Sequence, residues 1–220
     1  MRKIKFRVVE KFVSVNGEGL RSGEPTVFIR FFGCNLRCSY CDTQYSYGDS
    51  PWHWETLQEI VEYVKSTGIK NVTLTGGEPL FRDGMGELVE ALSGCHVEIE
   101  TNGSRLIHDM TKLINRPSIT LDYKTLSSGM RDKNLKTNYR FLTKRDCIKF
   151  VCGSEEDMED ALVVIKEHDL LRKTNVLFSP IFGAIEPIKI AKFIIRHKLN
   201  GARVQLQIHK IIWNPEERGV

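Results

Sequence analysis

The segment FGCNLRCSYCDTQY, at residues 32–45, places three cysteines at Cys34, Cys38 and Cys41. A four-iron, four-sulfur cluster has four iron corners, and three thiolates bind only three of them. The fourth iron stays open to a ligand from outside the chain, as a catalytic zinc ion keeps one position free. The C-x3-C-x2-C spacing therefore predicts a catalytic [4Fe-4S] cluster.

The ligand that suits such an open iron is S-adenosylmethionine, which chelates through its amino and carboxylate groups. An electron from the reduced cluster then cleaves the sulfonium and releases a carbon radical. Zinc is the weaker alternative, because Cys95, Cys147 and Cys152 form no second C-x2-C pair. A disulfide framework is weaker again, since 220 residues can bury a full core. These three cysteines are therefore predicted to be small core residues.

The composition is that of an ordinary globular protein, with 41% hydrophobic and 27% charged residues, and the length favours a single domain over residues 1–220. The net charge of +4 is spread along the chain, which favours a solvated surface over a nucleic-acid footprint. The first residues, MRKIKFRVVE, contain no apolar signal region, and no stretch is long enough to cross a bilayer. We therefore expect a cytoplasmic protein with neither nucleic acid nor membrane as a partner.

Short β-branched runs alternate with amphipathic segments, which favours βα units and a parallel sheet. The predicted strands are residues 27–32, 71–75, 96–101, 118–122, 147–152, 175–179 and 203–208. The predicted helices are residues 55–67, 155–168 and 187–198. The polar stretch 127–138 fits neither pattern.

Polar or glycine-rich residues follow most of these strands at their carboxyl ends. They are Cys34, residues 75–79 (TGGEP), residues 100–103 (ETNG), residues 122–124, Ser179 and His209. In barrels of parallel strands the active site lies at that end. The sequence therefore predicts an α/β protein, a partial and open parallel β/α barrel with its active site at the carboxyl ends of the strands.

Several of these residues suit the binding of a nucleoside cofactor. Gly76 and Gly77 let the backbone approach a ligand without a Cβ in the way. Glu100 and Asn102 offer hydrogen-bonding groups for ribose hydroxyls or an amino group. Tyr40 is placed either to lay its ring near an adenine or simply to pack over the cysteine loop.

The cysteine spacing with Tyr40, and the later TGGEP segment, resemble the radical S-adenosylmethionine superfamily. Residues 14–19 (SVNGEG), Arg30, the Cys41-Asp42-Thr43 sequence and residues 205–210 (QLQIHK) further resemble the 7-carboxy-7-deazaguanine synthase family. This family converts 6-carboxy-5,6,7,8-tetrahydropterin to 7-carboxy-7-deazaguanine with loss of ammonia in deazapurine (queuosine and archaeosine) biosynthesis. The likeness runs from about residue 8 to the carboxyl end.

The sequence departs from the usual pattern of that family in two places, which together involve three residues. Asn16 stands where the family usually has a glutamine, which is longer by one methylene. Asp122 and Tyr123 stand where it often has serine and proline, whereas Lys124 matches.

The resemblance, together with the side-chain chemistry above, implies three sets of site residues. The cofactor-binding residues are Tyr40, Cys41, Asp42, Gly76, Gly77, Glu78, Glu100, Asn102, Asp122, Tyr123, Lys124 and Ser179. The substrate-binding residues are Val15, Asn16, Gly17, Glu18, Arg30, Thr75, Gln207, His209 and Val220. The metal ligands are Cys34, Cys38 and Cys41 for the cluster and Thr43 for a magnesium ion.

The resemblance also implies how the reaction runs. A 5′-deoxyadenosyl radical abstracts a hydrogen from the pterin carbon that bears the carboxylate, the ring rearranges and ammonia leaves. Glu18 would accept hydrogen bonds from the amino-pyrimidinone edge, and Arg30 would pair with the substrate carboxylate. The alternatives are an ion pair of Arg30 with an acid of the chain, and a turn-capping role for Thr43.

Partners and other functions also follow from the resemblance. Reduced flavodoxin or ferredoxin is expected as the electron donor, and a homodimer as the assembly. The alternative function is that of an activase for a glycyl-radical enzyme, which shares the cysteines but not normally the GEG at residues 17–19. A noncatalytic electron-transfer protein is a third possibility, which would need no open iron. The tail, residues 211–220, either folds over the site or frays.

Overall fold

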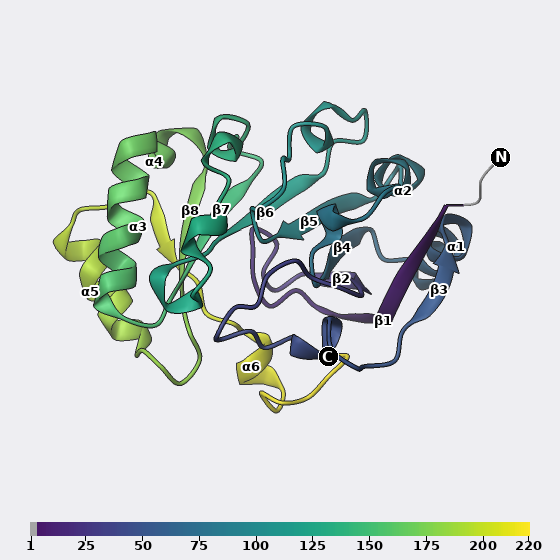
Figure 1. Ribbon diagram of the computed structural model, residues 1–220, viewed down its shortest axis with the longest axis horizontal. Coiled ribbons are helices and arrows are strands. Elements are labelled where there is room, and N and C mark those ends of the chain that lie inside the picture. Colours follow the sequence, from purple (N-terminus) through teal and green to yellow (C-terminus); the bar gives the residue numbers. More distant parts are fainter. Residues whose placement is uncertain (1–3) are drawn as a thin grey trace.

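The computed structural model describes residues 4–220, and within this range nine strands form one sheet in the order β3-β1-β2-β4-β5-β6-β7-β8-β9. The strands are β1 (Lys5–Val15), β2 (Pro25–Phe31), β3 (His53–Thr56), β4 (Asn71–Gly76), β5 (His96–Thr101), β6 (Ser118–Tyr123), β7 (Cys147–Cys152), β8 (Asn175–Pro180) and β9 (Ala202–Val204). Strand β2 and strands β4 to β9 pair in parallel, whereas β1 is antiparallel to both β2 and β3. The sheet stays open, with β3 and β9 at its two edges (Figure 1). The predicted partial barrel is confirmed.

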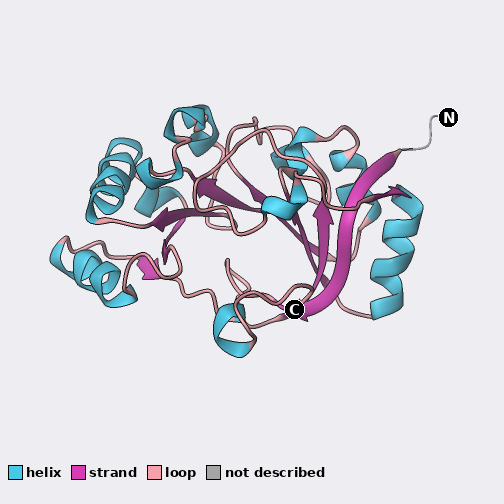
Figure 2. Ribbon diagram, turned by 60° about the horizontal axis from the view of Figure 1, so that its bottom comes forward, coloured by secondary structure: helices cyan, strands magenta, loops and turns pink. Residues whose placement is uncertain are grey.

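The helices lie around the outside of the strands (Figure 2). They are α1 (Leu57–Thr67), α2 (Met85–Ala91), α3 (Glu155–His168), α4 (Leu170–Lys173), α5 (Pro187–Arg196) and α6 (His209–Ile212). The loops contain six short 3-10 turns: η1 (Gln44–Ser46), η2 (Pro79–Phe81), η3 (Met110–Lys112), η4 (Leu126–Ser128), η5 (Arg131–Lys133) and η6 (Lys136–Arg140). No helix within residues 4–220 has the length and apolar character that crossing a bilayer requires.

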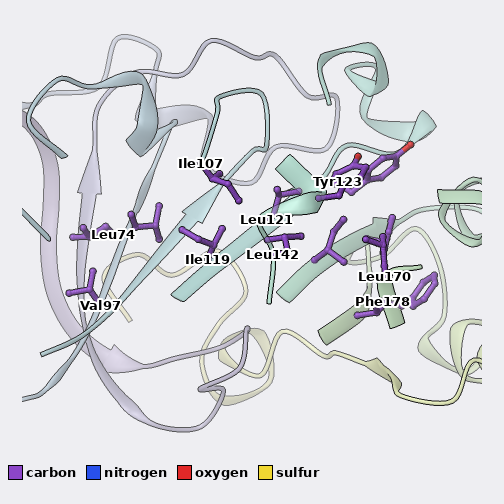
Figure 3. Packing of buried hydrophobic residues seen from close by; sticks show 14 of the residues in the cluster. Leu74, Val97, Ile107, Ile119, Leu121, Tyr123, Leu142, Leu170 and Phe178 are labelled. Carbon is purple, nitrogen blue, oxygen red and sulfur yellow. The ribbon is translucent and has the colours of Figure 1, made fainter. Parts of the chain in front are cut away.

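The two faces of the central strands differ in polarity because side chains alternate along a strand. The outward side chains are apolar and form the core under the helices, as Figure 3 shows for Leu74, Val97, Ile119, Leu121, Tyr123 and Phe178. The inward side chains include polar and charged ones on neighbouring strands, namely Thr75, Glu98, Glu100, Thr120, Asp122 and Lys149. This polar inner face provides one wall of the site.

Six predicted strands are present with small shifts at their ends, whereas several other elements differ from the sequence prediction. The first predicted helix, at 55–67, begins only at Leu57, because Thr56 caps it in a capping box with Glu59 and residues 53–56 belong to β3. The helix predicted at 187–198 ends at Arg196. Strands β1 and β3 and helices α2, α4 and α6 were not predicted at all.

The last predicted strand, at 203–208, is wrong beyond Val204. Residues 205–208 leave the sheet because tertiary hydrogen bonds replace the sheet ladder: Gln205 Oε1 accepts from the Gly19 amide at 2.9 Å, and the Ile208 amide donates to the Gly17 carbonyl at 3.2 Å. His209 therefore begins α6 instead of ending a strand.

Candidate active site

A cavity of about 680 Å³ lies against the polar inner face and the loops at the carboxyl ends of the strands. All the predicted site residues line it except Glu78, Tyr123 and Ser179. The tail residues 215–220 line it as well. The fold thus brings together the cysteine loop, the loop after β1 and the end of the chain around one cavity.

The three exceptions are buried beside the cavity. The Glu78 carboxylate accepts from the backbone amides of Leu80 at 2.9 Å and Asn102 at 2.7 Å, and so ties the loop after β4 to the end of β5. The Tyr123 side chain is on the outer face of the sheet (Figure 3), where its hydroxyl donates to Asp160 Oδ2 at 2.8 Å. Ser179 is 1% exposed on β8. Glu78, Tyr123 and Ser179 therefore pack behind the residues that line the cavity.

The cysteine loop leaves β2 and is fixed by backbone contacts with its neighbours. The Gly33 amide donates to the Ser46 carbonyl at 2.5 Å. A Cβ on Gly76 would lie 2.2 Å from the Phe31 oxygen, and one on Gly77 would lie 2.1 Å from the Gly33 oxygen. Both glycines therefore let the end of β4 pack directly on the cysteine loop, in addition to lining the cavity.

The thiols of Cys34, Cys38 and Cys41 all line the cavity. Burial raises the pKa of the Cys34 and Cys38 thiols, and the nearby Lys124 ammonium opposes that rise. Within residues 4–220 no three His, Cys, Asp or Glu side chains converge on a single ion. A four-iron cluster does not need such convergence, because each thiolate binds a different iron. The donor set therefore fits the cluster.

The three cysteines outside the loop pack in the protein as predicted. Cys147 and Cys152 are fully buried, and Cys95 is partly buried against the core. All three are free thiols.

The loop after β1 and the segment before α6 contact each other, although they come from opposite ends of the chain. Figure 1 shows the course of both segments. Gln207 Nε2 donates to Glu18 Oε1 at 2.7 Å. A Cβ on Gly17 would lie 1.8 Å from His209 Nδ1, so only glycine leaves room for the imidazole. The two segments that carried the family resemblance are therefore in direct contact.

Lys149 is a site residue that the sequence analysis missed. It lines the cavity from β7, forms an ion pair with Glu18, and lies 3.6 Å from Asp122 Oδ1. Burial opposes ionisation of Glu18, but the attraction of Lys149 and the hydrogen bonds from Gln207 and Lys149 together outweigh it and lower the pKa of the carboxyl. Glu18 is therefore held as a carboxylate inside the cavity.

Asn16 connects this loop to a buried acid on β5. Its Nδ2 donates to Glu98 Oε2 at 3.1 Å, and its Oδ1 accepts from the Glu18 amide at 3.2 Å. Burial and the neighbouring Glu100 charge raise the pKa of Glu98 to about 7. The asparagine at this position therefore holds the backbone of Glu18 over β5.

Arg30 lies on β2 and lines the cavity. Its Nε donates to Glu10 Oε1 at 2.6 Å, and the Tyr45 hydroxyl donates to the same oxygen at 3.1 Å. The ion pair considered as an alternative therefore exists. The two terminal nitrogens of Arg30 form no hydrogen bond with residues 4–220, so the guanidinium keeps an edge for an anion.

Thr43 precedes η1, and its side chain makes no capping hydrogen bond there. Its hydroxyl lies 3.7 Å from Cys41 Sγ. The capping role considered for Thr43 therefore has no support, since the hydroxyl pairs with Cys41 Sγ and not with the turn.

The tail folds back onto the cavity. Arg218 lies 4.0 Å from the centre of the Tyr45 ring, and residues 215–220 complete the lining. Just before the tail, Lys210 Nζ lies 3.4 Å from Asp42 Oδ2, which joins α6 to the cysteine loop.

An open β/α barrel with three cysteines after its first parallel strand defines a radical S-adenosylmethionine protein, and the Radical SAM superfamily model matches residues 28–176. The 7-carboxy-7-deazaguanine synthase of Clostridium acetobutylicum is 51% identical over 99% of this chain and 100% of its own length. That of Methanospirillum hungatei is 40% identical over 95% of this chain and 86% of its own length. The chain belongs to the 7-carboxy-7-deazaguanine synthase family.

Solved structures agree with the fold. QueE from Escherichia coli superimposes with a TM-score of 0.70 at 22% identity, over 92% of this chain and 93% of that one. A structure titled "Native anSMEcpe with bound AdoMet" matches with a TM-score of 0.53 at 16% identity, over 79% of this chain and 60% of that one.

Proposed function

We propose that the protein converts 6-carboxy-5,6,7,8-tetrahydropterin to 7-carboxy-7-deazaguanine with release of ammonia. The observation that carries this proposal is the ionised, buried Glu18 in the same cavity as the cysteine loop and Arg30. The full-length likeness to 7-carboxy-7-deazaguanine synthases supports it. The activase function is not favoured, because these relatives match the chain from end to end.

Cys34, Cys38 and Cys41 would hold a [4Fe-4S] cluster, with S-adenosylmethionine bound beside it. When reduced, this pair supplies a 5′-deoxyadenosyl radical. Asn102 and Lys124 line the cavity beside the cysteines, where an amide and a cation suit the carboxylate and hydroxyls of the cofactor.

The remaining cavity residues orient the pterin. The carboxylate of Glu18 suits the two parallel donors of the amino-pyrimidinone edge, and Gln207 and Lys149 fix its orientation. The free edge of Arg30 suits the carboxylate of the substrate. His209, packed against Gly17, closes this end of the cavity.

We also propose a magnesium ion at Thr43, which would share its shell with substrate oxygens and water. Magnesium keeps several waters and takes few protein ligands, so one hydroxyl that lines the cavity fits this site. A reduced flavodoxin or ferredoxin is proposed as the electron donor, and a homodimer as the assembly.

The test of this function is a product assay. Protein reconstituted without oxygen is incubated with the carboxytetrahydropterin, S-adenosylmethionine and dithionite, and the products are analysed by mass. We expect 7-carboxy-7-deazaguanine and ammonia in equal amounts, without consumption of the cofactor, because the reaction has no net redox change. Cleavage of the cofactor without any new pterin-derived product would refute the assignment.

Deletion of residues 215–220 should raise the substrate KM by about tenfold, because these residues line the cavity and their removal opens it to solvent. The change should not affect the absorption spectrum of the cluster. The measurement is steady-state kinetics of the deletion variant against the wild-type protein. Wild-type kinetics in the variant would show that the tail is not part of the substrate site.

A further inference from the structure

The polar stretch 127–138, which fits neither the helix nor the strand pattern of the sequence, contacts the loops around the cavity. It contains the end of η4, all of η5 and the start of η6. None of its residues lines the cavity. It nevertheless forms hydrogen bonds with the cysteine loop, with the loop after β5 and with the residue that follows β6. A segment that holds all three from outside the cavity can fix their relative positions.

The first contact is with the cysteine loop. The Ser39 amide donates to the Ser128 carbonyl at 3.1 Å, and the Ser39 hydroxyl donates to the Ser127 carbonyl. Ser39 directly follows Cys38, so η4 supports the part of the loop that carries this thiol. Asp157, a fully buried residue of α3, accepts from the Ser127 amide at 2.9 Å and anchors η4 in turn.

The second contact is with the loop after β5. Asn138 is fully buried, and its Nδ2 donates to the carbonyls of Gly103 at 3.1 Å and Arg105 at 2.7 Å. Its Oδ1 accepts from the Ile107 amide at 3.1 Å. One side chain therefore satisfies three backbone groups of this loop. Asn102, which lines the cavity, directly precedes the first of these residues.

The third contact is with Lys124, the residue that follows β6. The Lys124 amide donates to Asn134 Oδ1 at 2.9 Å, and Asn134 Nδ2 donates to the Lys124 carbonyl at 2.8 Å. Paired residues of two antiparallel strands exchange both of their backbone bonds in this way, so the Asn134 amide takes the place of a neighbouring strand. Asn134 Nδ2 also donates to the Arg131 carbonyl at 2.8 Å, which fixes the orientation of the amide.

Lys124 lies at the point where the sheet ends and the cavity begins. The register of β6 and β7 ends at Tyr123, which pairs with Phe150. Lys124 is 7% exposed and lines the cavity, and its Nζ donates to Asp122 Oδ2 at 2.9 Å. A lysine ammonium is a point charge on a flexible four-carbon stem, so its position depends on the backbone that carries it. Beyond the sheet, Asn134 holds this backbone.

We propose that Asn134 is a positioning residue for S-adenosylmethionine, because it fixes the backbone of Lys124 at the part of the cavity beside the cysteine loop. This inference rests on the proposed function, which assigns that part of the cavity to the cofactor. Asn134 lies outside the cavity and acts through Lys124. A lysine whose backbone is already ordered loses less conformational freedom when its ammonium meets an anion, which strengthens binding.

The test measures binding of S-adenosylmethionine to the reconstituted, oxidised holoenzyme without pterin, by anaerobic titration calorimetry. Asn134→Ala should raise the Kd by about tenfold, with the iron content and absorption spectrum of the wild-type protein. Asn134→Asp keeps the shape of the side chain but places an oxygen against the Lys124 carbonyl, so it should weaken binding as well. It is the second variant if alanine lowers the yield of folded protein.

A double-mutant cycle shows whether Asn134 acts through Lys124. Lys124→Met removes the ammonium and keeps most of the stem, and it should weaken binding of the cofactor by itself. In the Lys124→Met background, Asn134→Ala should raise the Kd by less than about twofold, because the group that it positions is already missing.

The matched control is Asn175→Ala, at the amino end of β8 and outside the cavity. Asn175 Nδ2 likewise donates to two carbonyls, those of Lys144 at 2.9 Å and Asp146 at 2.8 Å. Its Oδ1 accepts from Arg203 Nη2 at 3.1 Å. The control therefore removes a similar set of hydrogen bonds, and its Kd for the cofactor should be that of the wild-type protein.

Three results would overturn the proposal. They are a wild-type Kd in both Asn134 variants, a tenfold loss that persists in the Lys124→Met background, and an equal loss in Asn175→Ala. The last two would mean that Asn134 only stabilises the fold. Wild-type protein that binds the cofactor but forms no 7-carboxy-7-deazaguanine would contradict the proposed function instead, so the two failures are distinguished.

Discussion

Replacement of Cys34, Cys38 or Cys41 by alanine should abolish cleavage of S-adenosylmethionine. In the proposed assignment each thiolate holds one iron, so its loss would leave a second open iron or no stable cluster. The loop cannot supply a substitute ligand, because the other cysteines are buried elsewhere or packed against the core. Iron and sulfide analysis after anaerobic reconstitution, with product analysis of cofactor cleavage, measures the effect. We expect activity below detection and reduced iron content in all three variants.

The matched controls for this prediction are Cys95→Ser and Cys147→Ala. Cys95 is half-buried outside the cavity, and Cys147 is buried with its sulfur 3.1 Å from the Thr120 hydroxyl. Neither lines the cavity. Both variants should bind wild-type amounts of iron, and loss of the cluster in Cys147→Ala would show that the ligand assignment is wrong.

The parts of the site that sequence reasoning predicted depend on local patterns. The three cysteines lie within eight residues of one loop, so their spacing alone brings them to one place. The rim at the carboxyl ends follows from the alternation of strands and helices, since parallel strands all end on the same side. Neither inference needs to know which strand pairs with which.

The sequence analysis did less well where tertiary structure determines which side chains face the cavity. Residues 122–124 were assigned together to the cofactor, but successive side chains of a strand point to opposite faces. Asp122 and Lys124 therefore line the cavity, whereas Tyr123 packs among the core residues. The same alternation would have identified Lys149, a lysine inside the otherwise apolar strand β7, as an inward-facing cation.

The antiparallel strand β1 was missed for a different reason. It pairs with β2 through a register shift between Val8 and Glu10, which disturbs its alternating pattern. Helix α6 and the end of the chain depend on hydrogen bonds to residues 17–19, almost the full length of the chain away. Contacts between residues so far apart in the sequence cannot be predicted from local secondary-structure propensity.

Substitution of Glu18 by glutamine should lower kcat/KM for the pterin by about a hundredfold, on the order of 1.5 to 3 kcal/mol for the lost charge-assisted hydrogen bonds. The amide would replace one acceptor oxygen with a donor, which faces the donor edge of the substrate unfavourably. It would also leave Lys149 without its closest buried anion. Because the pKa of Glu18 is lowered, the wild-type carboxylate is already charged at neutral pH, so raising the pH above neutral should not increase wild-type turnover through this group.

The same variant should retain uncoupled cleavage of S-adenosylmethionine, because Glu18 lies with the residues assigned to the substrate and not with the cysteine loop. The matched control is Glu24→Gln, since Glu24 follows in the same loop, pairs with Arg21 on the surface and does not line the cavity. Steady-state kinetics of product formation and a separate assay of 5′-deoxyadenosine release measure the two activities. Equal loss of both in Glu18→Gln, with Glu24→Gln unaffected, would mean that Glu18 supports the cofactor or the fold. A selective loss of pterin turnover, by contrast, requires that the buried carboxylate held by Lys149 and Gln207 contacts the substrate.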